Sequence, residues 1–240
     1  MSRKSLAPLS SSALKAAAKR FGASLVRIAD LDLLRGILTH PADLLDGFTR
    51  AVSVAVRISD AAIETVEDRP TPLYAQHYLR VNAVLDEIGV KLANWLEERG
   101  VRALPLPASQ SLDREECYSF LSHKAVAVAA GIGWQGKSLL CISPEHGPRI
   151  RLTTILTDAD LKADPRLKNR CGKCTKCHDA CPAQAIKNVN TDWHYATRDE
   201  ALHFTRCRDK VIQEFAAIPH VGHPICGVCI RVCPWGKPNK

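Results

Sequence analysis

The stretch CGKCTKCHDACP at residues 171–182 decides the fold of the C-terminal part of this chain, together with CGVCIRVCP at residues 226–234. The first stretch has the spacing C-x2-C-x2-C-x3-C-P. The second has the spacing C-x2-C-x3-C-P, and Cys207 lies upstream as its fourth member. Such spacing is typical of segments that bind [4Fe–4S] clusters through cysteine thiolates. Eight of the ten cysteines therefore predict two cubane clusters.

The fourth cysteine of such a run precedes a proline, and it usually binds the neighbouring cluster. On that rule, each cluster takes three cysteines from one stretch and one from the other. The predicted ligands of the first cluster are Cys171, Cys174, Cys177 and Cys233. The predicted ligands of the second cluster are Cys207, Cys226, Cys229 and Cys181.

Other uses of cysteine fit this chain less well. Zinc sites favour two C-x2-C pairs, and disulfide frameworks are typical of short secreted chains. The N-terminal residues 1–22 include basic residues but lack the apolar core of a signal peptide. The sequence also lacks an apolar stretch of about 18 residues that could span a membrane. We therefore expect a protein of the reducing cytoplasm with no membrane partner.

The chain is basic, with a formal net charge of +8 from 33 basic and 25 acidic residues. Two [4Fe–4S]2+ clusters with their thiolates carry about −2 each and would lower this charge to about +4. Basic residues gather around the start of the first cysteine stretch: Lys162, Arg166, Lys168, Arg170, Lys173 and Lys176. We interpret them as a solvated face that offsets cluster charge. The alternative is a docking patch for an acidic electron donor or for RNA phosphates.

The residues before Cys171 combine helical and strand patterns. Helices are predicted at 10–21, within 73–99 and at 119–130, and Gly22 and Gly100 follow the first two. Strands are predicted at 25–28, 51–58, 102–106, 139–143 and 150–156. Because the pattern lacks a regular βαβ repeat, an α+β fold is favoured. We predict one domain at 1–160 and a second at 161–240.

The segment GIGWQGKS at residues 131–138 matches two phosphate-binding motifs, G-x-G-x-x-G and G-x4-G-K-S. Both motifs require a preceding strand and a following helix whose N-terminus faces the anion. Here a helical pattern precedes the segment, and Pro144 and Gly147 interrupt the residues that follow. An ATP-coupled iron–sulfur protein is therefore the weakest of the functional hypotheses.

Four segments occur in the order found in epoxyqueuosine reductases: AAGIGWQGKSLL, GPRIRLTTILTD, CGKCTKCHDACPAQAI and ICGVCIRVCPWG. From about residue 10 to residue 236, the chain resembles this family and the related reductive dehalogenases. The resemblance implies a cobalamin-binding, nitroreductase-like α/β sandwich followed by a ferredoxin-like domain with two [4Fe–4S] clusters. It also implies that electrons pass through both clusters to cobalt and then to the substrate.

The same resemblance implies residues that contact the corrinoid or its substrate. These are Gly131, Gly133, Trp134, Gly136, Lys137, Ser138 and Arg149. The family's catalytic aspartate lies in a D-x-x-P-x-x-E pattern, and its position corresponds to Cys117 here. Cys117, Tyr118 or His123 would then be the proton donor, for a substrate that differs from that of the family.

Larger family members continue into a helical-repeat domain that helps hold transfer RNA, and this chain stops at Lys240. We therefore expect a small-molecule or modified-nucleoside substrate and regard transfer RNA as a weaker candidate. Ferredoxin or flavodoxin is the expected electron donor. The first hypothesis is a cobalamin-dependent reductase. The alternative is a non-catalytic electron-transfer or corrinoid-activating protein that reduces a partner's cofactor, and the missing aspartate favours it.

Overall fold

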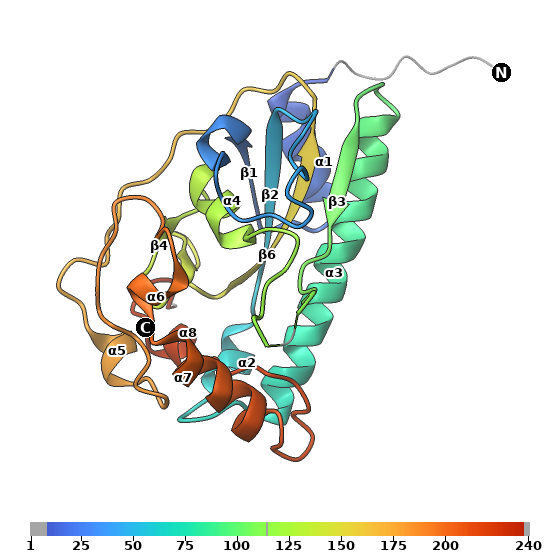
Figure 1. Cartoon of the computed structure of the whole chain (residues 1–240). Coiled ribbons are helices and arrows are strands. Elements are labelled where there is room, and N and C mark those ends of the chain that lie inside the picture. Colours follow the sequence, from blue (N-terminus) through green and yellow to red (C-terminus); the bar gives the residue numbers. More distant parts are fainter. Residues whose placement is uncertain (1–8, 114, 238–240) are drawn as a thin grey trace. The chain divides into compact units, whose positions relative to one another are not determined.

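The computed structural model describes residues 9–113 and 115–237, with a four-stranded sheet, a two-stranded hairpin and mostly short helices (Figure 1). The strands are β1 (Leu25–Asp30), β2 (Arg50–Arg57), β3 (Ala103–Leu106), β4 (Trp134–Gln135), β5 (Cys141–Ile142) and β6 (Ile150–Thr157). The α-helices are α1 (Ser11–Arg20), α2 (Asp60–Glu64), α3 (Pro72–Glu97), α4 (His123–Ala129), α5 (Lys176–Asp179), α6 (Arg198–Ala201), α7 (Phe204–Asp209) and α8 (Val228–Val232). A 3-10 helix occupies Leu31–Leu34, and a π-helix occupies Lys210–Phe215.

Residue contacts divide the chain into two compact units, each assembled from separate pieces of sequence. Unit 1 consists of Met1–Val56, Ala83–Gly131 and Leu152–Pro165. Unit 2 consists of Arg57–Asn82, Ile132–Arg151 and Arg166–Lys240. The pieces of unit 2 bring 132–151 together with the cysteine stretches. The predicted domains at 1–160 and 161–240 are consecutive stretches of sequence, whereas these units are defined by contacts between residues. The predicted domain boundaries therefore stay a prediction.

The four-stranded sheet has the order β1-β2-β6-β3. Strands β1 and β2 are antiparallel, with Leu25 opposite Ala55. Strands β3 and β6 are also antiparallel, with Ala103 opposite Thr157. Residues 51–55 of β2 are all buried, which means that both faces of this strand are covered because neighbouring side chains point to opposite faces. The small and β-branched residues AVSVA suit such a position.

Helix α1 is held in unit 1 at its N-terminus and near its middle. The Ser10 side chain accepts a hydrogen bond from the Ala13 backbone N–H at 3.1 Å, which caps the helix. Lys15 forms an ion pair of 2.6 Å with Asp164, and the same carboxylate accepts from the Ile28 N–H at 2.9 Å. Asp164 therefore joins α1 to β1.

The long helix α3 follows its predicted apolar stripe. Leu85, Ile88 and Leu92 are buried at the spacing of successive helical turns. Gly100 adopts a φ of +81° just beyond the helix, as expected of a glycine that ends one. Among the described residues, neither α3 nor any other helix has the length and apolarity needed to cross a membrane.

The predicted helices and strands before Cys171 are confirmed, with ends shifted by up to four residues. The largest shift occurs in α4, which starts at His123 because Ser122 acts as its N-cap. The sequence did not predict α2, β4 or the short helices of the C-terminal region. The mixed helix and sheet content confirms the α+β class.

Unit 2 has an apolar core that reaches the cysteines. Its buried members are Ile58, Ile63, Val66, Tyr74, Ala75, Val221, Ile225, Val228 and Ile230. The partly buried Cys226 and Cys229 pack against this core, and so does Ala180, next to Cys181. The core therefore supports the backbone that carries the second cysteine stretch.

Candidate functional site

Short helices and turns of unit 2 position the eight cysteines. Cys177 lies on α5, Cys207 on α7 and Cys229 on α8, and Cys233 is the C-cap of α8. Gly227 begins α8 with a φ of +92°, which glycine adopts without steric cost. A β-carbon at Gly227 would lie 2.8 Å from Cε1 of Tyr74, so this position also requires a residue without a side chain.

The four cysteines predicted for the first cluster line one cavity in unit 2. Its lining includes Cys171, Cys174, Cys177, Cys229 and Cys233. Burial, together with the nearby Cys171, Cys177 and Cys174, raises the pKa of Cys233 to about 11. Cys229 and Cys233 both come from the second stretch, and Cys233 is the one that the exchange rule assigns to the first three cysteines.

The other predicted set is also gathered. Burial raises the pKa of Cys226 to about 11, and nearby Cys207 and Cys181 act in the same direction. Burial also raises the pKa of Cys229 well above its usual range, with further contributions from Cys226 and Cys207. These thiols are protonated at neutral pH, and binding of iron would release their protons. The thiol chemistry and the grouping of the cysteines fit two clusters.

Across residues 9–113 and 115–237, no group of three or more His, Cys, Asp or Glu side chains could hold a single metal ion. A cubane cluster makes a different demand, because four thiolates each bind a separate iron.

Residues 132–137 of the GIGWQGK loop lie in unit 2 and contact the first cysteine stretch directly. The Trp134 indole N–H donates to Cys171 Sγ at 3.4 Å, and Lys137 Nζ donates to the Cys174 carbonyl at 2.9 Å. Both side chains are buried, with exposures of 1% and 4%. Asn169 connects the same segments, since its side chain donates to the Gln135 carbonyl and accepts from the Cys171 N–H.

The loop glycines are explained by packing. A β-carbon on Gly133 would lie 2.1 Å from the Ile142 carbonyl oxygen, and one on Gly136 would lie 2.7 Å from Cγ1 of Ile142. Gly131 has a φ of +76° directly after α4. The segment follows a helix and leads through a turn into β5, so no helix N-terminus faces a phosphate here. The surroundings of GIGWQGKS therefore differ from the strand–loop–helix context that both phosphate motifs require.

These contacts bear on the predicted cofactor-binding residues. Gly133, Trp134, Gly136 and Lys137 are buried against other parts of unit 2, and Ser138 lines the cysteine cavity. As placed, the first four do not present a surface to a macrocycle. Their role in contacting a corrinoid stays a prediction.

The predicted cofactor residue Arg149 is 1% exposed and forms an ion pair with Asp60. Its Nη1 lies 2.7 Å from Asp60 Oδ1 and 3.8 Å from Glu64 Oε1. The arginine thus joins the start of β6 to α2 inside unit 2. This contact gives Arg149 a structural role, and its contact with a cofactor stays a prediction.

The three predicted proton donors lie in unit 1 and differ in their surroundings. Cys117 is exposed, with a φ of +52°. Tyr118 is half-buried and stacks on His40, with ring centroids 4.1 Å apart. His123 Nδ1 lies 2.8 Å from Thr154 Oγ1, and its Nε2 lies 2.9 Å from the Pro107 carbonyl oxygen. Because a carbonyl only accepts, Nε2 carries a proton that is already used in the fold.

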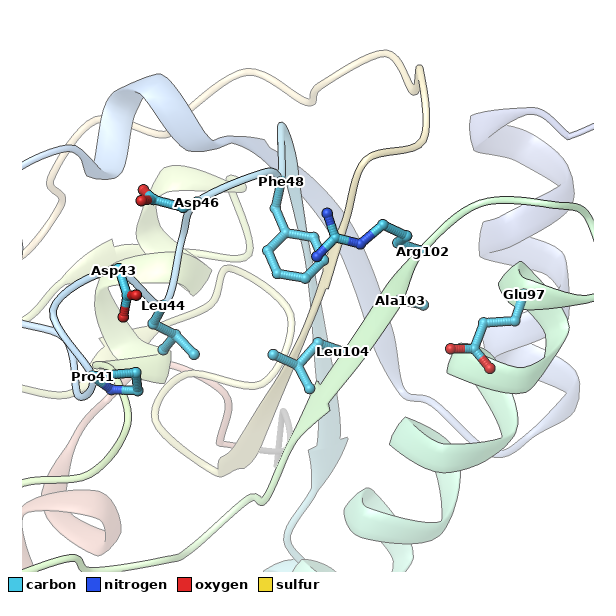
Figure 2. A pocket seen from close by; sticks show the side chains of 9 residues that line it. All are labelled: Pro41, Asp43, Leu44, Asp46, Phe48, Glu97, Arg102, Ala103 and Leu104. Atoms are coloured by element: carbon cyan, nitrogen blue, oxygen red, sulfur yellow. The ribbon is translucent and has the colours of Figure 1, made fainter.

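Unit 1 also has an open pocket of about 420 Å³ beside β3 (Figure 2). The Arg102 guanidinium lies 4.8 Å from the centroid of the Phe48 ring. The carboxylates of Asp43, Asp46 and Glu97 lie around it. The predicted cofactor-binding residues do not line this pocket.

Sequence reasoning missed several residues of this arrangement. Asn169 and His40 lie outside any motif, and Trp235 lies within the segment ICGVCIRVCPWG, which gives it no role of its own. Gly147 and Gly236 form a close backbone contact, because a β-carbon on Gly147 would lie 1.9 Å from the Trp235 carbonyl oxygen. The sequence segments 147–149 (GPR) and 234–236 (PWG) carry these glycines and could have indicated that the positions matter. The contact between the two segments could not be predicted from the sequence.

Comparison with known proteins adds a family context. The model of a 4Fe-4S double cluster binding domain matches residues 170–236. An epoxyqueuosine reductase of Synechococcus sp. (strain CC9605) is 32% identical over 206 residues, which cover 81% of this chain and 58% of that protein. The chain spans about half the length of the curated relatives it matches.

Solved structures show the same fold. One is a reductive dehalogenase whose structure suggests a mechanism for B12-dependent dehalogenation. The match covers 99% of this chain and 35% of the dehalogenase chain, with a TM-score of 0.75 and 19% sequence identity. An epoxyqueuosine reductase solved with an epoxyqueuosine-modified tRNA stem loop matches 93% of this chain and 64% of its own, with a TM-score of 0.61 and 23% identity.

Proposed function

Because this chain is homologous to the epoxyqueuosine reductases and the reductive dehalogenases, we propose that it is an iron–sulfur oxidoreductase that uses two [4Fe–4S] clusters. The grouping of the cysteines is the observation that supports this proposal most. Cys233 lies among Cys171, Cys174 and Cys177, while Cys181 lies near Cys207 and Cys226. This exchange between two stretches is the arrangement expected of paired cubanes.

The proposed electron acceptor is a bound cobalamin, which would supply a strongly reducing cobalt. Its support is the fold shared with a dehalogenase described as B12-dependent. The residues that the family resemblance assigns to this cofactor are mostly buried in unit 2. We therefore propose that the chain's contacts with a corrinoid come largely from other residues.

The substrate is proposed to be a small molecule or a modified nucleoside. An epoxyqueuosine reductase has been solved with a modified tRNA stem loop, which supports a nucleoside class. Cys117 is the exposed member of the three candidate proton donors.

Ferredoxin or flavodoxin is the proposed electron donor. A reducing compartment such as the cytoplasm would keep the cysteines available for iron.

Anaerobic reconstitution with iron and sulfide tests this proposal. The reconstituted protein is mixed with hydroxocobalamin, separated from the excess, and analysed for iron and visible absorption. We expect about eight irons per chain, together with corrinoid absorption that stays with the protein. The same treatment of a Cys171→Ser, Cys174→Ser, Cys226→Ser, Cys229→Ser variant should leave almost no iron.

The outcomes separate the parts of the proposal. Eight irons without retained corrinoid would contradict the cobalamin step and leave the electron-transfer alternative. A wild-type protein that takes up no cubane iron would contradict the oxidoreductase itself.

A further inference from the structure

The indole of Trp134 has an unusual acceptor for a buried N–H group. The side chain is 1% exposed, and its Nε1 donates to Cys171 Sγ at 3.4 Å. An indole N–H can only donate, and a buried one usually requires a partner. Thiol sulfur is a weak acceptor, whereas an iron-bound thiolate carries negative charge and accepts more strongly. The contact is therefore better suited to a protein with its cluster bound.

The ring is held in this place from several sides. Trp134 packs edge-on against Trp235, with ring centroids 4.8 Å apart and an angle of 80° between the planes. Trp235 follows Cys233-Pro234 and lines the cysteine cavity, and Trp134 contacts Cys171, which lines the same cavity. Gly133 packs so closely against the Ile142 backbone that a β-carbon there would lie 2.1 Å from the Ile142 carbonyl oxygen. The donor is thus positioned independently of whether the thiol is ionised.

Lys137 adds a positive charge at the same cavity. Its ammonium group donates to the Cys174 carbonyl at 2.9 Å and is 4% exposed. Lys137, with its buried ammonium group, therefore lies three positions after Trp134, whose indole N–H points to Cys171, on the same loop. Both interact more favourably with a cluster of greater negative charge.

We propose that Trp134 is a positioning residue that raises the reduction potential of the first cluster through its N–H···S hydrogen bond to Cys171. This proposal rests on the proposed function, since it requires that the cluster binds. Reduction adds one electron from the donor and converts [4Fe–4S]2+ to [4Fe–4S]+, with no bond made or broken. The extra negative charge strengthens the hydrogen bond, and hydrogen bonds to cluster sulfurs are known determinants of potential.

A potentiometric titration of the reconstituted holoprotein, followed by electron paramagnetic resonance, tests the proposal. The Trp134→Phe variant keeps an aromatic ring but lacks the N–H donor. We expect the midpoint of one cluster to move to a more negative potential, while the other midpoint stays unchanged. The second cluster thus provides a control within the same molecule.

Trp193→Phe is the matched control variant. Trp193 belongs to the same unit, and its ring lies under the Arg166 guanidinium, whereas the indole N–H of Trp134 points to Cys171 Sγ. We expect both midpoints of this variant to equal those of the wild type. If Trp134→Phe binds the full complement of iron and keeps the wild-type midpoints, the proposal is wrong.

A second measurement decides the case in which Trp134→Phe fails to bind iron. Wild-type protein with 15N in its tryptophan indoles is reduced and analysed by pulsed electron paramagnetic resonance. A 15N coupling to one cluster, retained in both Trp193→Phe and Trp235→Phe, supports the hydrogen bond, and its absence overturns the proposal. Failure of the wild type to bind iron would instead contradict the proposed function.

Discussion

Three residues of unit 2, Cys233, Trp134 and Arg149, interact with partners that lie far from them in the sequence. The proline after the fourth cysteine predicts that Cys233 joins the first stretch, and the fold brings Cys233 near Cys171, Cys177 and Cys174. The contact of Trp134 with Cys171 joins positions 37 residues apart and has no local signature. Arg149 illustrates the same limit, since its partner Asp60 is 89 residues away. A sequence motif thus marks such residues as candidates for a role, but it does not indicate which residues they contact in the fold.

The exchange of ligands between the stretches can be tested with pairs of cysteine substitutions. We expect the Cys171→Ser, Cys233→Ser protein to keep about four irons, because both substitutions remove ligands of one cluster. Cys171→Ser with Cys181→Ser should keep almost none, because each substitution removes a ligand of a different cluster. Iron analysis after anaerobic reconstitution measures both.

The two pairs control for each other, since each lacks two cysteines. If each stretch held its own cluster, the results would be reversed: Cys171→Ser with Cys181→Ser would keep four irons. That reversal would contradict the ligand sets proposed here.

Helices and strands with a strong hydrophobic periodicity could be predicted from the sequence. The short helices and strands near the cysteines could not. The stripe of α3 and the β-branched run of β2 follow from their own residues. Helices α5 and α8 have four and five residues, which is too short for a periodic pattern. Strands β4 and β5 have two residues each and depend on glycine packing against Ile142. Tertiary contacts therefore determine the elements nearest the site.

Helix α8 should depend on the glycine that starts it. Gly227→Ala would impose a left-handed conformation on alanine, at about 1–2 kcal/mol, and crowd Tyr74, at about 1–3 kcal/mol. Because Cys229 and Cys233 lie on and beside α8, we expect a lower thermal midpoint and less bound iron.

Gly222→Ala provides the matched control. Gly222 also has a positive φ, of +65°, but a β-carbon there meets no atom within 4 Å. This variant should therefore lose stability through backbone strain alone and keep more iron than Gly227→Ala. Equal losses in the two variants would show that contact with Tyr74 does not matter.

At the scale of the whole molecule, the sequence predicts the net charge, and the fold determines where the charged side chains lie. The chain carries a formal +8, and bound clusters would reduce this to about +4. Lys168, Arg170, Lys173 and Lys176 are exposed around the first cysteine stretch. Within this group, Arg170 also lies 5.8 Å from the centroid of the Trp134 ring. The composition could not indicate whether this group is a docking patch or a solvated face.

Charge reversal distinguishes these interpretations. Each Lys→Glu change alters the net charge by −2, so Lys168→Glu with Lys173→Glu alters it by −4. If an acidic flavodoxin docks at this patch, we expect its rate of electron transfer to the protein to fall about tenfold at low ionic strength. The wild-type rate should decrease as salt is added, since salt screens exposed charges. Stopped-flow mixing with reduced flavodoxin measures both effects.

Arg20→Glu with Arg27→Glu is the control, because it changes the net charge by the same −4 at two exposed positions of unit 1. This control should keep most of the wild-type rate if the patch itself recognises the donor. Equal slowing in both double variants would mean that only net charge matters, and no slowing in either would favour the solvated face. The comparison thus separates a docking surface, which depends on where the charges lie, from a general electrostatic attraction, which depends on their sum.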